Sequence, residues 1–146
     1  TILFGFLLYF SEKYNVNKTI KNNFNIKSAI IIGIFQVISL IPGVSRSGIT
    51  ITAARLLNFK RVDATKISFL LSIPTLGAVS VFGVKNILTN SDISFSILNI
   101  AAIFLSFLFS YLTIKYFLDF VKKFNLTVFV IYRVILGLAL LALAYL

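Results

Sequence analysis

The stretch PGVSRSGIT at residues 42–50 decides the fold, because it separates two apolar segments that are each too short to cross a bilayer. The segments cover residues 28–42 and 45–57, and as helices they would be roughly 22 and 20 Å long. The hydrocarbon core of a membrane is about 30 Å thick. Pro42 lacks a backbone donor and Gly43 accepts a positive φ, so this pair interrupts a helix. The sequence therefore predicts a re-entrant helical hairpin over residues 28–57, with its tip inside the membrane.

The composition excludes an ordinary water-soluble domain. Of 146 residues, 59% are apolar and only 12% are charged, against about 25% charged in soluble domains. Apolar stretches at 67–84, 93–114 and 126–146 meet or approach the roughly 20 residues that a transmembrane helix needs. Residues 1–10 resemble the end of a truncated span, which suggests a fragment of a longer chain. We expect one all-α integral membrane domain, in which a bundle of transmembrane helices carries the re-entrant hairpin.

The charge distribution supports this topology. If residues 28–57 enter and leave by one face, the cytoplasmic loops carry ten Lys and Arg residues and the outer loop carries one. A single crossing would divide these residues five to six, which contradicts the positive-inside rule. The re-entrant topology places the C-terminus outside. The net charge of +10 comes mostly from loops between apolar runs, so we do not expect nucleic acid as a partner.

Arg46 is the residue that most needs an explanation. An arginine inside a bilayer costs about 2.5–3.5 kcal/mol on insertion scales, and it usually faces a cavity and an anion. The four carboxylates, the only acidic residues of the chain, lie in or beside polar loops, where none can pair with Arg46. The chain contains no Cys and no His, so no metal site is visible. An anion from elsewhere must therefore balance Arg46.

The residues around Arg46 favour a phosphate. Ser45 is a good N-cap, and the amides of the helix that follows add partial positive charge. Gly43 allows close approach of the backbone, while the Ser47 and Thr50 hydroxyls add donors. The predicted phosphate site therefore consists of Gly43, Ser45, Arg46, Ser47 and Thr50. A plain hairpin turn with a capped helix is the alternative, although such a turn does not need an arginine at depth.

Small polar residues form two stripes on the longer apolar stretches. Each stripe follows an i, i+4, i+7 spacing, and the two consist of Ser68, Ser72 and Thr75, and of Ser106, Ser110 and Thr113. In lipid, such stripes allow helices to approach closely and to form interhelical hydrogen bonds. We expect both stripes to pack helices together.

Four further polar residues lie within apolar stretches. Gln36 and Ser39 are spaced i, i+3, and they line the cavity near the tip or bond to a neighbouring helix. For Arg133 we expect a structural pair, or a side chain that extends toward the interface; contact with the substrate is the alternative. Arg55 is expected at the membrane interface.

PGVSRSGIT resembles the PGxSRSxxT signature of the undecaprenyl pyrophosphate phosphatases, the bacitracin-resistance family. The resemblance extends to IIGIFQ at 31–36, FLLSIP at 69–74 and IYR at 131–133. It covers nearly the whole chain and corresponds to the C-terminal half of the family. The signature is specific to that family.

The resemblance implies a function in lipid-carrier recycling. Family members hydrolyse an undecaprenyl diphosphate to the monophosphate and phosphate, which serves peptidoglycan synthesis, and they are multi-pass proteins of the bacterial plasma (inner) membrane. They are built from two inverted halves whose re-entrant tips meet, so the chain would be half of an inverted-repeat fold. By this resemblance Ser45, Arg46, Ser47 and Thr50 are the catalytic residues present. A missing N-terminal half would supply Glu and His residues, and a divalent cation (magnesium or calcium) and a homodimer are compatible with it.

The residues present do not complete an enzyme. No side chain between Pro42 and Thr50 is a strong base, and phosphoryl transfer needs a group that activates the nucleophile. We therefore expect the 146-residue chain alone to bind phosphate weakly and not to turn over. The alternative function is half of an inverted-repeat membrane anion transporter or channel. A purely structural membrane subunit would leave Arg46 unexplained.

Overall fold

The computed structural model describes residues 2–13, 16–89 and 97–145, and these residues are predominantly helical. The helices, in chain order, are α1 (Ile2–Glu12), α2 (Ile20–Asn23), α3 (Ile26–Val37), the 3-10 helix η1 (Ile38–Leu40), α4 (Arg46–Leu56), α5 (Arg61–Thr89), α6 (Ile97–Lys123) and α7 (Thr127–Tyr145). One isolated bridge joins Lys18 to Phe59. The chain therefore has the all-helical architecture that the sequence predicts.

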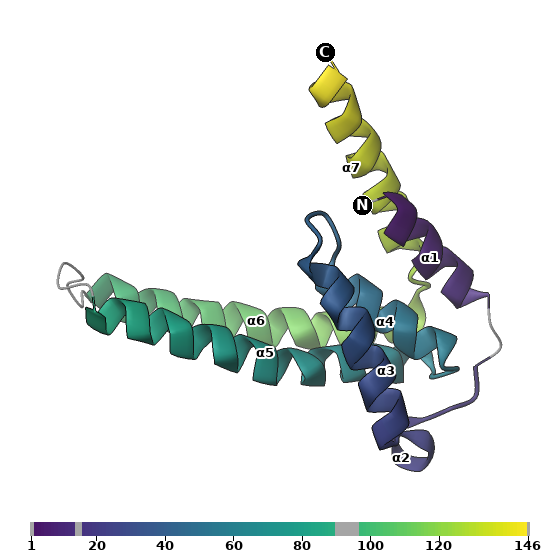
Figure 1. The fold of residues 1–146 in the computed structure, drawn as a ribbon, viewed down its shortest axis with the longest axis horizontal. Helices are drawn as coiled ribbons and strands as arrows, with labels where there is room; N and C mark the ends of the chain where they lie inside the picture. The colour runs from purple at the N-terminus through teal and green to yellow at the C-terminus, as the bar shows by residue number, and fades with distance from the viewer. Residues whose placement is uncertain (1, 14–15, 90–96, 146) are drawn as a thin grey trace.

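Helix α4 is the centre of the arrangement. It packs against α1, α3 and α5. Two pairs of helices extend from it in different directions: α5 with α6, and α1 with α7 (Figure 1). The short helix of the PGVSRSGIT stretch is thus surrounded by the longer elements.

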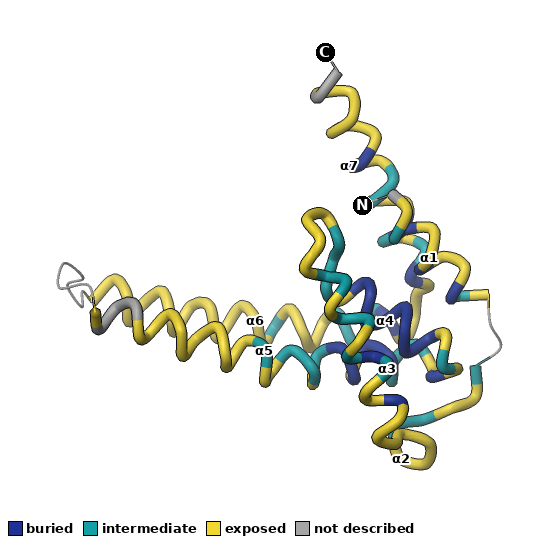
Figure 2. The backbone as a smooth tube through the Cα atoms, in the orientation of Figure 1, coloured by how far each residue is buried: buried dark blue, intermediate teal, exposed yellow. Residues whose placement is uncertain are grey.

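Burial follows the same division. Ala53 and Ala54 of α4 are 1% and 0% exposed, and Figure 2 shows buried residues around α4 while the outer parts of α5, α6 and α7 are exposed. Helices α5 and α6 contain stretches long and apolar enough to cross a membrane, Arg61–Lys85 and Ile97–Lys123. A soluble monomer rarely exposes so much contiguous apolar surface. A membrane bundle explains these two helices.

The helices extend beyond the predicted apolar stretches. Helix α5 begins at Arg61 rather than at residue 67, and α6 ends at Lys123 rather than at residue 114. Helical hydrogen bonding does not stop where side chains become polar, so hydropathy marks the apolar core of a helix and not its ends. The first residue of the 93–114 stretch lies outside the described residues.

A tight turn joins the two short helices. The Val44 amide donates to the Ile41 carbonyl at 3.1 Å, and Gly43 has φ of 85°. Pro42 and Gly43 therefore occupy the central positions of a type II turn, where the second position requires a positive φ. The predicted break at Pro42-Gly43 is confirmed. Helices α3 and α4 pack against each other as a helical hairpin.

The other end of α4 is also closed by local hydrogen bonds. The Asn58 amide donates to the Arg55 carbonyl at 2.9 Å, and the Phe59 amide to the Ala54 carbonyl at 3.1 Å. Asn58 has φ of 70° and Phe59 is fully buried. This is a Schellman motif with asparagine in the left-handed position. It ends α4 and turns the chain into α5.

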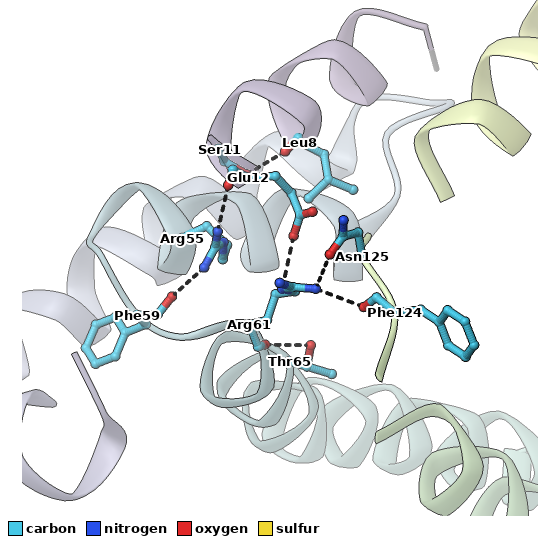
Figure 3. A network of polar contacts seen from close by, with 9 residues as sticks. All are labelled: Leu8, Ser11, Glu12, Arg55, Phe59, Arg61, Thr65, Phe124 and Asn125. Atoms are coloured by element: carbon cyan, nitrogen blue, oxygen red, sulfur yellow. Dashed lines mark hydrogen bonds and ion pairs between the residues drawn. The ribbon is translucent and has the colours of Figure 1, made fainter. Parts of the chain in front are cut away.

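A polar network fixes α4 to α1 (Figure 3). Arg55 donates to the Phe59 carbonyl at 3.3 Å and to the Glu12 carbonyl at 3.1 Å, and it is only 3% exposed. Burial lowers the pKa of Arg55, while the neighbouring Glu12 carboxylate opposes this shift. The expectation that Arg55 lies at an interface is wrong, because α1 covers it.

Arg61 extends this network to the connection between α6 and α7. Its Nε lies 3.6 Å from Glu12 Oε1, and its Nη1 donates to the Phe124 carbonyl at 3.0 Å and to the Asn125 side chain. The network therefore holds α1, α4, α5 and the start of α7 in place at the end of α4 opposite Arg46.

Ala54→Leu tests the central position of α4. Ala54 has no exposed surface, and overpacking a core costs typically about 1–3 kcal/mol. We expect a lower midpoint of thermal unfolding in detergent. Ala101→Leu, at an exposed position of α6, is the control and should leave the midpoint unchanged; equal midpoints for both variants would contradict the packing described above.

Candidate functional site

The N-terminus of α4 is a ready anion site. Ser45 is its N-cap, and the Ser45 side chain accepts a hydrogen bond from the Gly48 amide at 3.3 Å. The first amides of a helix have no intrahelical acceptor, so those of Arg46 and Ser47 lie at its open, partly positive end. The predicted capping role of Ser45 is confirmed.

Arg46 and Ser47 line a cavity of about 460 Å³. The other lining residues come from α5 and α6: Ser68, Phe69, Ser72, Phe109, Ser110, Thr113 and Ile114. Arg46 is half-buried, and it is the only charged residue among them. The cavity therefore has one cation, several hydroxyls and an apolar wall, which suits an anion with an attached apolar group.

A second arginine reaches the same helix end. The Arg133 guanidinium of α7 lies against Gly48, so close that a Cβ at residue 48 would be 2.5 Å from Nη2 and 2.8 Å from Cζ. Residues two apart on a helix face different directions, so Arg133 and Arg46 approach the first turn of α4 from different sides. Arg133 extends toward α4, which is not the contact that we expected for it.

These two guanidinium groups have no carboxylate partner in the described part of the chain. The ion pairs there join Glu12 to Arg61 and Asp119 to Lys122. Asp92 lies outside the described residues. Two cations and a helix N-terminus thus share a region whose balancing anion is not among the side chains that the structure describes.

Thr50 is part of the predicted site but does not face the cavity. Its hydroxyl lies 2.9 Å from the Arg46 carbonyl, 3.1 Å from the Ser47 carbonyl and 2.7 Å from Ser68 Oγ, and the residue is 1% exposed. Thr50 therefore joins the first turn of α4 to α5. Its predicted contact with phosphate stays a prediction.

Gln36 and Ser39 are not among the residues that line the Arg46 cavity. Gln36 Nε2 donates to Thr75 Oγ1 at 3.0 Å, and Ser39 Oγ donates to the Gln36 carbonyl at 2.6 Å. Of the two predicted alternatives for Gln36, the structure has the hydrogen bond to a neighbouring helix. Gln36 therefore links the hairpin to α5.

The described residues offer no group of three His, Cys, Asp or Glu side chains that would hold a metal ion. A divalent cation does not fit the residues around Arg46, because hard cations need several oxygen ligands, usually carboxylates. The chemistry of this site is that of a guanidinium group, hydroxyls and helix amides.

The fold and this site define a class: a helical membrane protein with an arginine-centred anion site at the end of a short helix. A family model described as "Bacitracin resistance protein BacA" matches residues 1–139. The chain belongs to that family.

Curated relatives agree with this assignment. The chain is 50% identical over 145 residues to a protein of Pelagibacter ubique named "Undecaprenyl-diphosphatase", covering 99% of this chain and 56% of that protein. Proteins with the same name from Chromohalobacter salexigens and Elusimicrobium minutum are 44% and 40% identical, covering 97% and 96% of this chain and 53% and 52% of those proteins. The chain thus spans about half the length of these relatives.

Gly48→Ala tests the place of Arg133. A Cβ at residue 48 would displace the mobile end of that side chain without touching backbone, so we expect unchanged thermal stability. Loss of a hydrogen bond to a charged group costs about 1.5–3 kcal/mol, and inorganic phosphate should bind roughly ten to a hundred times more weakly. Titration calorimetry of the native protein measures this change.

Gly33→Ala is the matched control, since nothing lies within 4 Å of a Cβ at residue 33. It should bind phosphate like the wild type. Equal affinity of Gly48→Ala and wild type would show that Arg133 takes no part in anion binding.

Proposed function

We propose that this chain is the C-terminal, phosphate-binding half of an undecaprenyl-diphosphatase. The enzyme hydrolyses undecaprenyl diphosphate to the monophosphate and phosphate, and so recycles the lipid carrier of bacterial cell-wall synthesis. The observation that carries the proposal is the convergence of Arg46, Arg133 and the N-terminus of α4 in a chain of the bacitracin-resistance family.

In this proposal, positioning and charge stabilisation are the contribution of this chain. Phosphoryl transfer builds negative charge on the phosphate oxygens, and preorganised donors that wait for this charge lower the barrier. Arg46 and Ser47 bind the phosphate from the cavity side, and the amides of the first turn complete the contacts. Ser45 and Thr50 hold that turn in shape. Arg133 adds a positive charge from the other side.

The group that activates the nucleophile lies outside this site. Arg46 is the only ionisable residue that lines the cavity, and a guanidinium group does not act as a base at neutral pH. In the proposed complete enzyme, a second re-entrant tip supplies Glu and His residues. A divalent cation would take its ligands from these residues and from the substrate phosphates.

The proposed setting is the bacterial plasma membrane, which the protein crosses several times. The helical hairpin of α3 and α4 then enters and leaves the bilayer by the cytoplasmic face, in agreement with the distribution of Lys and Arg. The tip at Pro42-Gly43 brings the α4 N-terminus to a depth where a lipid headgroup enters while its isoprenyl tail stays in the bilayer. The complete fold is an inverted repeat, and a homodimer is compatible with it.

An anion transporter is the second candidate. The observation that favours it is the absence of a base from the cavity lining, since a carrier needs an anion site but no acid–base pair. The two candidates differ in one measurable property, which is release of phosphate from a diphosphate lipid.

Arg46→Ala tests the proposed enzyme. Removal of a preorganised donor for the developing charge costs roughly 10²–10³-fold in kcat, so we expect the native protein to lose phosphate release from undecaprenyl diphosphate by about this factor. Lys66→Ala removes an exposed charge of α5 and is the control. Near-normal hydrolysis by the Arg46→Ala variant would favour the transporter.

The 146-residue chain alone provides an independent test. It has the phosphate site without a base, so we expect it to bind inorganic phosphate weakly in detergent and to release none from undecaprenyl diphosphate. Supplying the remaining part of the Pelagibacter relative together with this chain should restore turnover. Steady turnover by the isolated chain would contradict the division of roles proposed above.

A further inference from the structure

The two polar stripes of α5 and α6 meet at the Arg46 cavity, although only their function in packing was expected. Ser68 and Ser72 of one stripe, and Ser110 and Thr113 of the other, are among the residues that line it. Hydroxyls from two helices therefore face the same space as the Arg46 guanidinium.

The hydroxyls of α5 are already engaged in protein hydrogen bonds. Ser68 Oγ lies 2.7 Å from Thr50 Oγ1, and Ser72 Oγ donates to the Phe69 carbonyl at 2.6 Å. Thr75, one turn further, donates to the Leu71 carbonyl at 3.0 Å and accepts from Gln36. This stripe has the packing role that stripes of small polar residues usually have in lipid.

The hydroxyls of α6 differ. Across the described ranges, Ser110 and Thr113 make no hydrogen bond, and both are exposed. Serine and threonine in a helix commonly bond to the carbonyl three or four residues before them, as Thr52, Thr65 and Ser80 do in this chain. Ser110 and Thr113 therefore keep their donors available in the cavity.

The surroundings of these two donors indicate the kind of ligand. Their neighbours Phe109 and Ile114 also line the cavity, and Phe69 adds a second aromatic ring. The volume of about 460 Å³ lies within the roughly 300–1,000 Å³ of small-molecule sites. A group bound to Ser110 and Thr113 thus lies next to apolar walls, whereas a group bound to Arg46 lies at the positive end of α4.

We propose that Ser110 and Thr113 bind the phosphate that stays on the lipid, while Arg46 and Ser47 bind the terminal phosphate. This assignment rests on the proposed function. The terminal phosphate carries the larger negative charge and takes the arginine and the helix amides. The lipid-side phosphate is bonded to the first isoprene unit, which packs against Phe69 and Phe109. The α6 pair thereby selects a diphosphate that bears an isoprenyl chain.

The experiment measures three ligands on the native protein. The variant Ser110→Ala/Thr113→Val removes both donors, and we expect at least about a tenfold rise in KM for farnesyl diphosphate, a short isoprenyl diphosphate. Inhibition by farnesyl monophosphate should weaken by a similar factor. Inhibition by inorganic phosphate, which occupies the terminal site, should not change. Thr113→Ser on the Ser110→Ala background should recover part of the loss.

Ser106→Ala is the matched control, because Ser106 belongs to the same α6 stripe but does not line the cavity. An unchanged KM for the double variant would overturn the inference, as would a loss of the same size for Ser106→Ala or for inorganic phosphate. Midpoints of thermal unfolding identify variants that fail to fold. These outcomes are separate from the proposed function, whose failure would be the absence of hydrolysis in the wild type.

Discussion

The structure depends on positive charge held at the N-terminus of α4 without a carboxylate to balance it among the described residues. Arg46 and Arg133 approach the same first turn from different sides, and the partial charge of the helix end adds to theirs. Two cations close together repel each other, and a low-dielectric surrounding strengthens that repulsion. Such an arrangement is stable when an anion occupies it, so the site is built around its ligand.

The rest of α4 holds that end in place. Pro42 and Gly43 make the type II turn before it, and the Schellman motif at Asn58 ends the helix. Between these points Ala53 and Ala54 allow the neighbouring helices to approach closely. The network of Glu12, Arg55 and Arg61 fixes the far end. A helix held at both ends keeps its first turn in one position, which preorganised binding requires.

Identical spacing does not give the two polar stripes the same role. The hydroxyls of Ser68 and Ser72 bond to protein groups, whereas Ser110 and Thr113 remain free in the described structure. The difference comes from the partners that tertiary packing brings to each stripe: α5 lies against α4, while α6 packs on the outer side of α5. One stripe therefore joins helices, and the other is available to a ligand.

The sequence by itself determined the helical class, the break at Pro42-Gly43, the cap at Ser45 and the family signature, because each follows from local backbone chemistry or from contiguous residues. Helix ends were displaced by several residues, since hydropathy does not report where hydrogen bonding stops. Only the tertiary structure decided that Arg133 reaches Gly48, that Thr50 supports the site from beneath, and that α1 buries Arg55. These positions depend on contacts between residues far apart in the chain, and such contacts leave no local pattern.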